Sequence, residues 1–133
     1  MPIPTLSHLI LLVGSNPTPN AVAAKILANP DAKITLIYTH KLPELAERLE
    51  TWIKKLSGHY QVQRQGPIDE SSAEEIQKAI EEALKNEQRE NKNTCIGLHY
   101  TGGTKAMSVH AYRSLERWCE QNHLSKPTCS YLD

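Results

Sequence analysis

The chain has 133 residues, 39% of them hydrophobic, a size and composition typical of one globular domain with a single core. Its 15 basic and 15 acidic side chains cancel, which excludes the overall positive field of proteins that bind duplex nucleic acid or anionic membranes without specificity. The three cysteines, Cys95, Cys119 and Cys129, are odd in number and lack CxxC spacing, so we expect free thiols in a cytoplasmic protein rather than a zinc knuckle or a disulfide-stapled secreted fold.

The first predicted element is a strand. Residues 8–13 form a largely aliphatic run, which is typical of a strand buried on both faces. This longest apolar stretch is far shorter than the roughly 20 residues of a membrane-spanning helix, and no signal-peptide pattern precedes it. We therefore expect neither a membrane segment nor secretion. Thr18 as N-cap and Pro19 after it then predict a helix that reaches residues 29–30.

The middle of the chain continues this alternation. Residues 33–38 predict a second strand. Thr39, followed by Pro43, predicts the start of a second helix, whose apolar side chains stack on one face until Gly58 ends it. Residues 60–65 predict a weaker and more polar strand, which we place towards one edge of the sheet.

The last third of the chain repeats the pattern twice. Ser71 or Ser72 caps a third helix, whose first turn carries acidic side chains that the helix dipole favours. A polar loop follows over residues 87–93. The remaining predicted elements are a strand over residues 94–100, a long helix over residues 104–122 with Met107, Ala111, Leu115 and Trp118 on one side, and a final strand over residues 128–132.

This order, β-α-β-α-β-α-β-α-β, predicts an α/β domain: a Rossmann-like open, mostly parallel sheet with helices on both faces. We expect residues 1–133 to form a single domain that ends on a strand, as if it had been cut from a longer protein. In a doubly wound sheet of order 3-2-1-4-5, the first and fourth strands lie side by side where the winding reverses. Ligands usually bind in the crevice beyond the ends of those strands.

Two glycines stand between the predicted fourth strand and the longest helix, in the segment YTGGTK at residues 100–105. Glycines let a backbone approach a ligand closely, the helix contributes its positive N-terminus, and Thr101, Thr104 and Lys105 add two hydroxyls and an ammonium group. This combination favours a phosphate group. The spacing matches neither the P-loop nor the dinucleotide fingerprint, which disfavours NTP hydrolysis and NAD chemistry. The plain alternative is a tight turn in which Thr104 only caps the helix.

Two further loops are expected at the same edge of the sheet. Gly14, Ser15 and Asn16 follow the first strand and offer a flexible glycine, a hydroxyl and an amide, although a turn that merely caps the next helix explains them too. Thr39 and His40 follow the second strand, where the imidazole can stack on a base or bond to it. The six histidines lack metal-binding spacing, so we expect no metal site.

The GSNP segment at residues 14–17 and the TGGTKAM segment at residues 101–107 resemble the CARF domain, the CRISPR-associated Rossmann fold, in a likeness that covers nearly the whole chain. The resemblance is to the sensor domains at the N-terminus of CRISPR nucleases. It implies a homodimer that binds a cyclic oligoadenylate, most of all cyclic tetra-adenylate, in the type III CRISPR antiviral response, and it implies no cofactor. The candidate ligand-binding residues are Gly14, Ser15, Asn16, Thr39, His40, Thr101, Gly102, Gly103, Thr104 and Lys105.

Several functions stay open at this point. The loops supply hydrogen-bond donors without an obvious general base, which favours a binding module, either within a longer effector or alone as a ligand sink. A metal-independent ring nuclease is the alternative: a ribose 2′-hydroxyl would attack its own phosphate, Lys105 would stabilise the transition-state charge, and Ser15 or Thr101 would position the phosphate. A nucleotide-binding stress protein or small phosphatase is a third interpretation.

Overall fold

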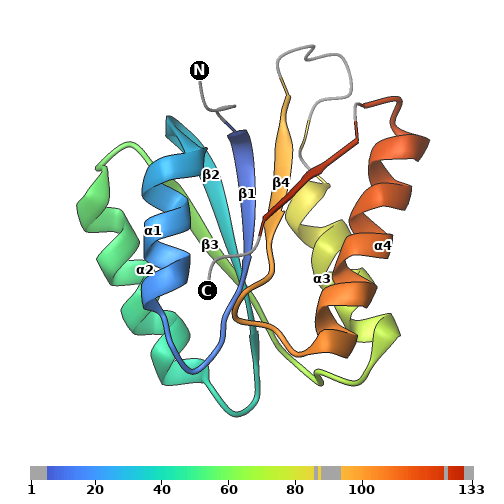
Figure 1. Ribbon diagram of the computed structural model, residues 1–133, viewed down its shortest axis with the longest axis horizontal. Helices are drawn as coiled ribbons and strands as arrows, with labels where there is room; N and C mark the ends of the chain where they lie inside the picture. The colour runs from blue at the N-terminus through green and yellow to red at the C-terminus, as the bar shows by residue number, and fades with distance from the viewer. Residues whose placement is uncertain (1–5, 86, 88–93, 125, 131–133) are drawn as a thin grey trace.

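The computed structural model describes residues 6–85, 87, 94–124 and 126–130, and in this part of the chain five parallel strands form one sheet of order β3-β2-β1-β4-β5 (Figure 1). The strands are β1 (Leu6–Leu12), β2 (Ala28–Thr39), β3 (Gln61–Ile68), β4 (Ile96–His99) and β5 (Thr128–Ser130). The helices are α1 (Thr18–Leu27), α2 (Pro43–Leu56), α3 (Ala73–Leu84) and α4 (Lys105–Gln121). The predicted α/β class and the alternation of strands and helices are confirmed.

Two pairs of helices cover the two faces of the sheet, with α1 and α2 on one face and α3 and α4 on the other (Figure 1). The central strand β1 contributes to both cores. Leu9 and Leu11 pack into the core beneath α1 and α2, whereas Ile10 and Leu12 pack into the core beneath α3 and α4. Successive side chains of a strand point to opposite faces, so the predicted burial of this strand on both faces is confirmed.

The boundary between α1 and β2 differs from the sequence prediction. The helix ends at Leu27 and the strand follows directly, whereas the sequence predicted helix up to residues 29–30. The pairing with β1 explains the difference: Leu6 pairs with Ala28, and the register then shifts before pairing resumes. Pro30 lies in this irregular stretch, where a residue without a backbone N–H is tolerated.

The helix caps were predicted in part. Ser72 and Thr104 each accept the backbone N–H of the residue three positions later, at 3.1 Å, as the sequence predicted. Thr39 is not a cap, because it is the last residue of β2 and the ladder with β3 extends through it. Helix α2 starts instead after Leu42. Thr18 is the first helical residue of α1 rather than its N-cap.

The remaining elements agree with the sequence prediction in kind. The polar strand β3 lies at one edge of the sheet, as expected. Of the predicted loop over residues 87–93, only Glu87 is among the described residues, and the end of the predicted last strand, residues 131–132, lies outside them. None of the described helices is both long enough and apolar enough to cross a membrane.

Candidate functional site

Two glycine loops meet at the carboxyl edge of the sheet, where the strands end. One loop is residues 13–17 after β1, and the other is residues 100–104 after β4. Because β1 and β4 are paired neighbours, both loops emerge side by side. A Cβ on Gly14 would come within 2.7 Å of Gly102 Cα, and a Cβ on Gly102 would come within 2.5 Å of Gly14 N. Glycine is therefore required at both positions for the backbones to touch.

The loop after β4 is a tight turn that leads directly into α4. The Gly103 N–H donates to the Tyr100 carbonyl oxygen at 3.1 Å. Thr104 then caps the helix, and its backbone carbonyl accepts a 2.9 Å hydrogen bond from the Ser108 hydroxyl. Lys105, the first helical residue, is exposed. The N-terminus of a 17-residue helix carries a partial positive charge that attracts anions.

Gly103 meets a different constraint from the one that the sequence suggested. A Cβ at this position would lie 2.7 Å from Leu12 Cδ1 and 3.3 Å from Ser108 Oγ. The space is thus filled by the protein's own side chains rather than left for an approaching ligand. Glycine at 103 serves the packing of the turn on β1.

The loop after β1 presents two exposed polar residues. Asn16 Oδ1 accepts the Thr18 N–H at 3.2 Å, which is the turn-capping role that the sequence offered as the plain alternative. Ser15 is exposed at the same turn. Both the Ser15 hydroxyl and the Lys105 ammonium group therefore face solvent at the edge where Gly14 and Gly102 touch.

The loop after β2, which starts at Thr39 and His40, contacts β3 and the residues that follow β3. Thr39 is nearly fully buried, and His40 is exposed. Lys41 Nζ lies 3.5 Å from Glu70 Oε1. Hydrogen bonds from the backbone and the hydroxyl of Ser71 hold the pKa of Asp69 below its ordinary value. These carboxylates make this part of the edge less suited to a phosphate group than the N-terminus of α4.

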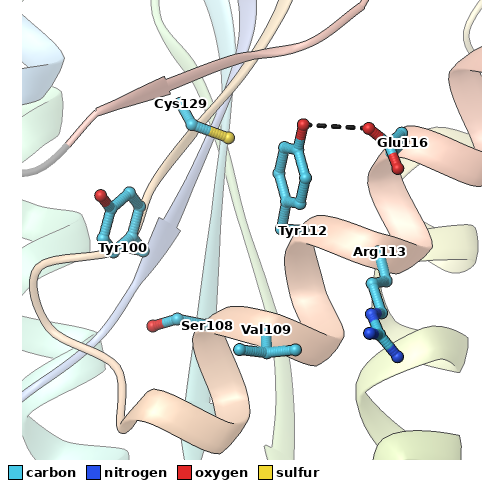
Figure 2. Close-up of a pocket in the computed structure, with 7 residues that line it drawn as sticks. All are labelled: Tyr100, Ser108, Val109, Tyr112, Arg113, Glu116 and Cys129. Carbon is cyan, nitrogen blue, oxygen red and sulfur yellow. Dashed lines mark hydrogen bonds between the residues drawn. The ribbon is translucent and has the colours of Figure 1, made fainter.

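A hollow of about 450 Å³ opens beside the glycine turn, along the side of α4 that faces β5 (Figure 2). Figure 2 shows the Tyr100 and Tyr112 rings on opposite sides of it, with Cys129 above and Val109 below. The Tyr112 hydroxyl donates to Glu116 Oε2 at 3.0 Å. The residues that line the hollow are Tyr100, Ser108, Val109, Tyr112, Arg113, Glu116 and Cys129.

This hollow was not predicted from the sequence, in which only one apolar side of α4 was recognised. The signal was present, because residues at positions 109, 112, 113 and 116 follow helical spacing and share one face. What no local pattern reveals is that Tyr100 and Cys129, from two other segments, complete the wall.

Cys129 and Tyr112, which line the hollow, are poor nucleophiles at neutral pH. Partial burial, and next the negative charge of Glu116, raise the pKa of the Cys129 thiol to about 11. The hydrogen bond to Glu116 raises the pKa of Tyr112. Outside the hollow, burial lowers the pKa of His99, at the end of β4, which favours the neutral form of its imidazole. Among the residues that the structure covers, no group of three or more His, Cys, Asp or Glu side chains could hold a metal ion.

Comparisons with known proteins agree with this fold. Residues 8–123 match the family model described as the Card1 CARF domain. Among solved structures, the chain is similar to Can2 from Sulfobacillus thermosulfidooxidans in complex with cyclic tetra-adenylate, with a TM-score of 0.60 and 18% sequence identity over 96% of this chain and 32% of that one. The chain thus spans about a third of the Can2 chain. No curated protein matches.

Proposed function

Since the chain belongs to the Card1 CARF domain family, we propose that it binds a cyclic oligoadenylate at the carboxyl edge of its sheet and acts as a sensor in a type III CRISPR response. Cyclic tetra-adenylate, the molecule bound to the similar structure of Can2, is the ligand that we expect. Residues 1–133 form the sensing unit, whether alone or within a longer effector. The observation that carries this proposal is the contact between Gly14 and Gly102 at the N-terminus of α4.

The chemistry of this edge suits a phosphodiester. The turn after β4 ends at the N-terminus of α4, where the helix dipole favours negative charge. Lys105 is exposed there and takes part in none of the ion pairs found within the described ranges. The Ser15 hydroxyl adds a donor from the neighbouring loop. A phosphate held by a lysine gains charge-assisted hydrogen bonds, which are stronger than neutral ones.

The hollow beside the turn suits an adenine base. Two half-buried rings line it: Tyr100 opens the glycine turn, and Tyr112 lies on α4. Aromatic side chains stack on bases with about 1 to 3 kcal/mol per base. A phosphate at Lys105 and a base between these rings would lie next to each other, because Tyr100 belongs both to the hollow and to the turn that leads to Lys105.

The proposed ligand calls for two copies of the chain. A cyclic tetra-adenylate has two-fold symmetry, and an isologous dimer matches it with one self-complementary patch. We place this patch at the exposed side of α4, where Val109 stands one turn after Lys105 and is 49% exposed. Light scattering should then give about twice the 14.9 kDa mass of one chain. Val109→Glu should give monomers, whereas Val22→Glu, at a half-exposed position on α1, should leave the dimer intact.

Calorimetry with three ligands tests the binding proposal. Cyclic tetra-adenylate should bind more tightly than linear tetra-adenylate and far more tightly than AMP, because only the ring presents its phosphates to both halves of the dimer at once. Equal affinity for AMP would contradict the proposal and favour a mononucleotide-binding or phosphatase function instead. A monomer at micromolar concentration, with and without ligand, would contradict it as well.

Ring cleavage is a second candidate function, favoured by the exposed Ser15 and Lys105 at the same edge. In this reaction a ribose 2′-hydroxyl attacks the adjacent phosphorus, a 2′,3′-cyclic phosphate forms, and the 5′-oxygen leaves and takes up a proton. Lys105 would stabilise the charge that develops on the phosphate oxygens. Incubation of the protein with cyclic tetra-adenylate in EDTA, followed by chromatography, tests this. Linear products with 2′,3′-cyclic phosphate ends would support cleavage. An intact ring would contradict it and leave ligand binding without cleavage as the proposed function.

A further inference from the structure

Asn20 occupies an unusual position for an asparagine. It lies in the first turn of α1, and it is 0% exposed. Its Nδ2 donates a 3.2 Å hydrogen bond to the Leu12 carbonyl oxygen. The pairing of β1 with β4 ends one residue earlier, at Leu11 and His99. Leu12 is still paired with Ile37 of β2, and the Asn20 side chain adds a second hold on it just beyond the point where pairing with β4 stops.

The carbonyl group that Asn20 holds is also the one on which Gly102 rests. A Cβ on Gly102 would overlap the Leu12 carbonyl oxygen as well as approach Gly14 N. The contact is therefore so close that a shift of Leu12 would move Gly102. Gly102 belongs to the turn that leads to Lys105, so the Leu12 carbonyl group is one of the contacts that position the turn before α4.

The oxygen of the Asn20 amide indicates that the stability of the core alone does not explain an asparagine at this position. Its Oδ1 has no hydrogen-bond partner within the described ranges, although it is buried. A buried polar atom without a partner costs about 1 to 3 kcal/mol of stability. A leucine of similar volume would remove this unpartnered oxygen, although the Leu12 carbonyl oxygen would then lose its Asn20 donor. Residues that lower stability in this way are typical of functional sites, where geometry matters more than the stability of the core.

We propose that Asn20 is a positioning residue of the ligand site: its amide fixes the Leu12 carbonyl group, against which Gly102 sets the turn that presents Lys105. This role rests on the proposed function, because the site is the one proposed to bind cyclic tetra-adenylate. Asn20 itself does not touch the ligand. Its effect on affinity passes through the backbone of the two glycine loops.

The variant Asn20→Leu tests the role, because it removes the donor and the unpartnered acceptor with little change in volume. Affinity for cyclic tetra-adenylate should fall at least tenfold, while the midpoint of thermal unfolding should change little, because the unpartnered Asn20 Oδ1 is removed as the Leu12 carbonyl oxygen loses its donor. Asn20→Ala provides a second, smaller side chain if leucine does not fit. The matched control is Asn122→Leu: Asn122 is buried at the other end of α4, and its Nδ2 donates to the Trp118 carbonyl oxygen at 2.8 Å. This control should keep the wild-type affinity.

Amide hydrogen exchange without ligand separates this role from the proposed function. The Val13 N–H donates to Ile37 O at 2.9 Å, and the Gly103 N–H donates to Tyr100 O at 3.1 Å. Both amides should exchange faster in Asn20→Leu than in the wild type and in the Asn122→Leu control. If the wild type does not bind cyclic tetra-adenylate, the proposed function fails. The exchange rates then still show whether Asn20 holds the two glycine loops in position.

Three outcomes overturn the positioning role. The first is wild-type affinity in Asn20→Leu, whatever the exchange rates do. The second is unchanged exchange at Val13 and Gly103, because the loops would then not depend on Asn20. The third is an equal loss of affinity in the Asn122→Leu control, which would point to general destabilisation rather than to the position of the turn.

Discussion

Gly14 and Gly102 touch through their backbones at the carboxyl edge of the sheet, although they lie far apart in the sequence, and neither position has room for a Cβ. This contact joins the loop after β1 to the loop after β4 and makes them one surface. Lys105 and Ser15 stand exposed on that surface.

Gly14→Ala should separate the two loops. The added methyl group would collide with the Gly102 backbone, which cannot move aside as a flexible side chain would, so we expect a loss of about 1 to 3 kcal/mol in the free energy of unfolding together with weaker binding of cyclic tetra-adenylate. Urea unfolding and calorimetry measure the two effects. Gly58→Ala is the control, because no atom lies within 4 Å of its added Cβ. Wild-type stability and affinity in Gly14→Ala would show that the contact is not needed.

Lys105→Ala should weaken binding without affecting the fold. A hydrogen bond to a charged group is worth about 1.5 to 3 kcal/mol, so the affinity should fall roughly tenfold or more, while the unfolding midpoint stays constant because the side chain is exposed. Lys25→Ala, an exposed lysine in the last turn of α1, should change neither quantity. Unchanged affinity in Lys105→Ala would remove this residue from the site.

Tyr112 should contribute through its ring rather than its hydroxyl. Tyr112→Leu removes the proposed stacking surface, worth about 1 to 3 kcal/mol, and should lower the affinity at least roughly fivefold. Tyr112→Phe keeps the ring and loses only the hydrogen bond to Glu116, so its affinity should stay near that of the wild type. Titration of both variants with cyclic tetra-adenylate measures the two affinities and so separates the role of the ring from that of the hydroxyl. Equal affinities for the two variants would place the base elsewhere.

Glu87 should make the stability of the domain depend on pH. His8 on β1 is fully buried, with Nδ1 2.6 Å from Glu87 Oε1 and Nε2 2.7 Å from Thr35 Oγ1. Burial alone would raise the pKa of Glu87, but the hydrogen bond from His8 and the charges of His8 and Lys33 lower it below its ordinary value. A carboxyl group of this kind stabilises the fold above its unfolded pKa, and the contribution is lost as pH falls through the folded pKa.

The measurement is urea unfolding between pH 7 and acidic pH. Glu87→Gln should be less stable than the wild type at pH 7, and the difference should shrink as pH falls below about 4, near the ordinary pKa of a glutamate. Glu47→Gln is the control, since Glu47 is exposed in the middle of α2 and takes part in none of the ion pairs within the described ranges. A difference between Glu87→Gln and the wild type that stays constant with pH would contradict the prediction.

Local patterns in the sequence were enough to predict the order of the elements and the ends of several of them. The aliphatic run of β1 indicates burial on both faces, and Ser72 and Thr104 can act as caps because each cap depends on residues three positions away. The same patterns identified the glycines at 14, 102 and 103 as turn residues beside a helix N-terminus. These features are set by interactions within a few residues, which is why one sequence suffices for them.

Only the tertiary structure decided which residues meet across the sheet. The pairing of Leu6 with Ala28 starts β2 earlier than its own residues suggest, and the ladder with β3 keeps Thr39 in the strand rather than at a helix cap. The contact of Gly14 with Gly102, the hollow between α4 and β5, and the burial of Asn20 beside Leu12 all join residues from separate elements. Such contacts depend on how strands are ordered and paired, and strand pairing is a non-local interaction that no short window of sequence contains.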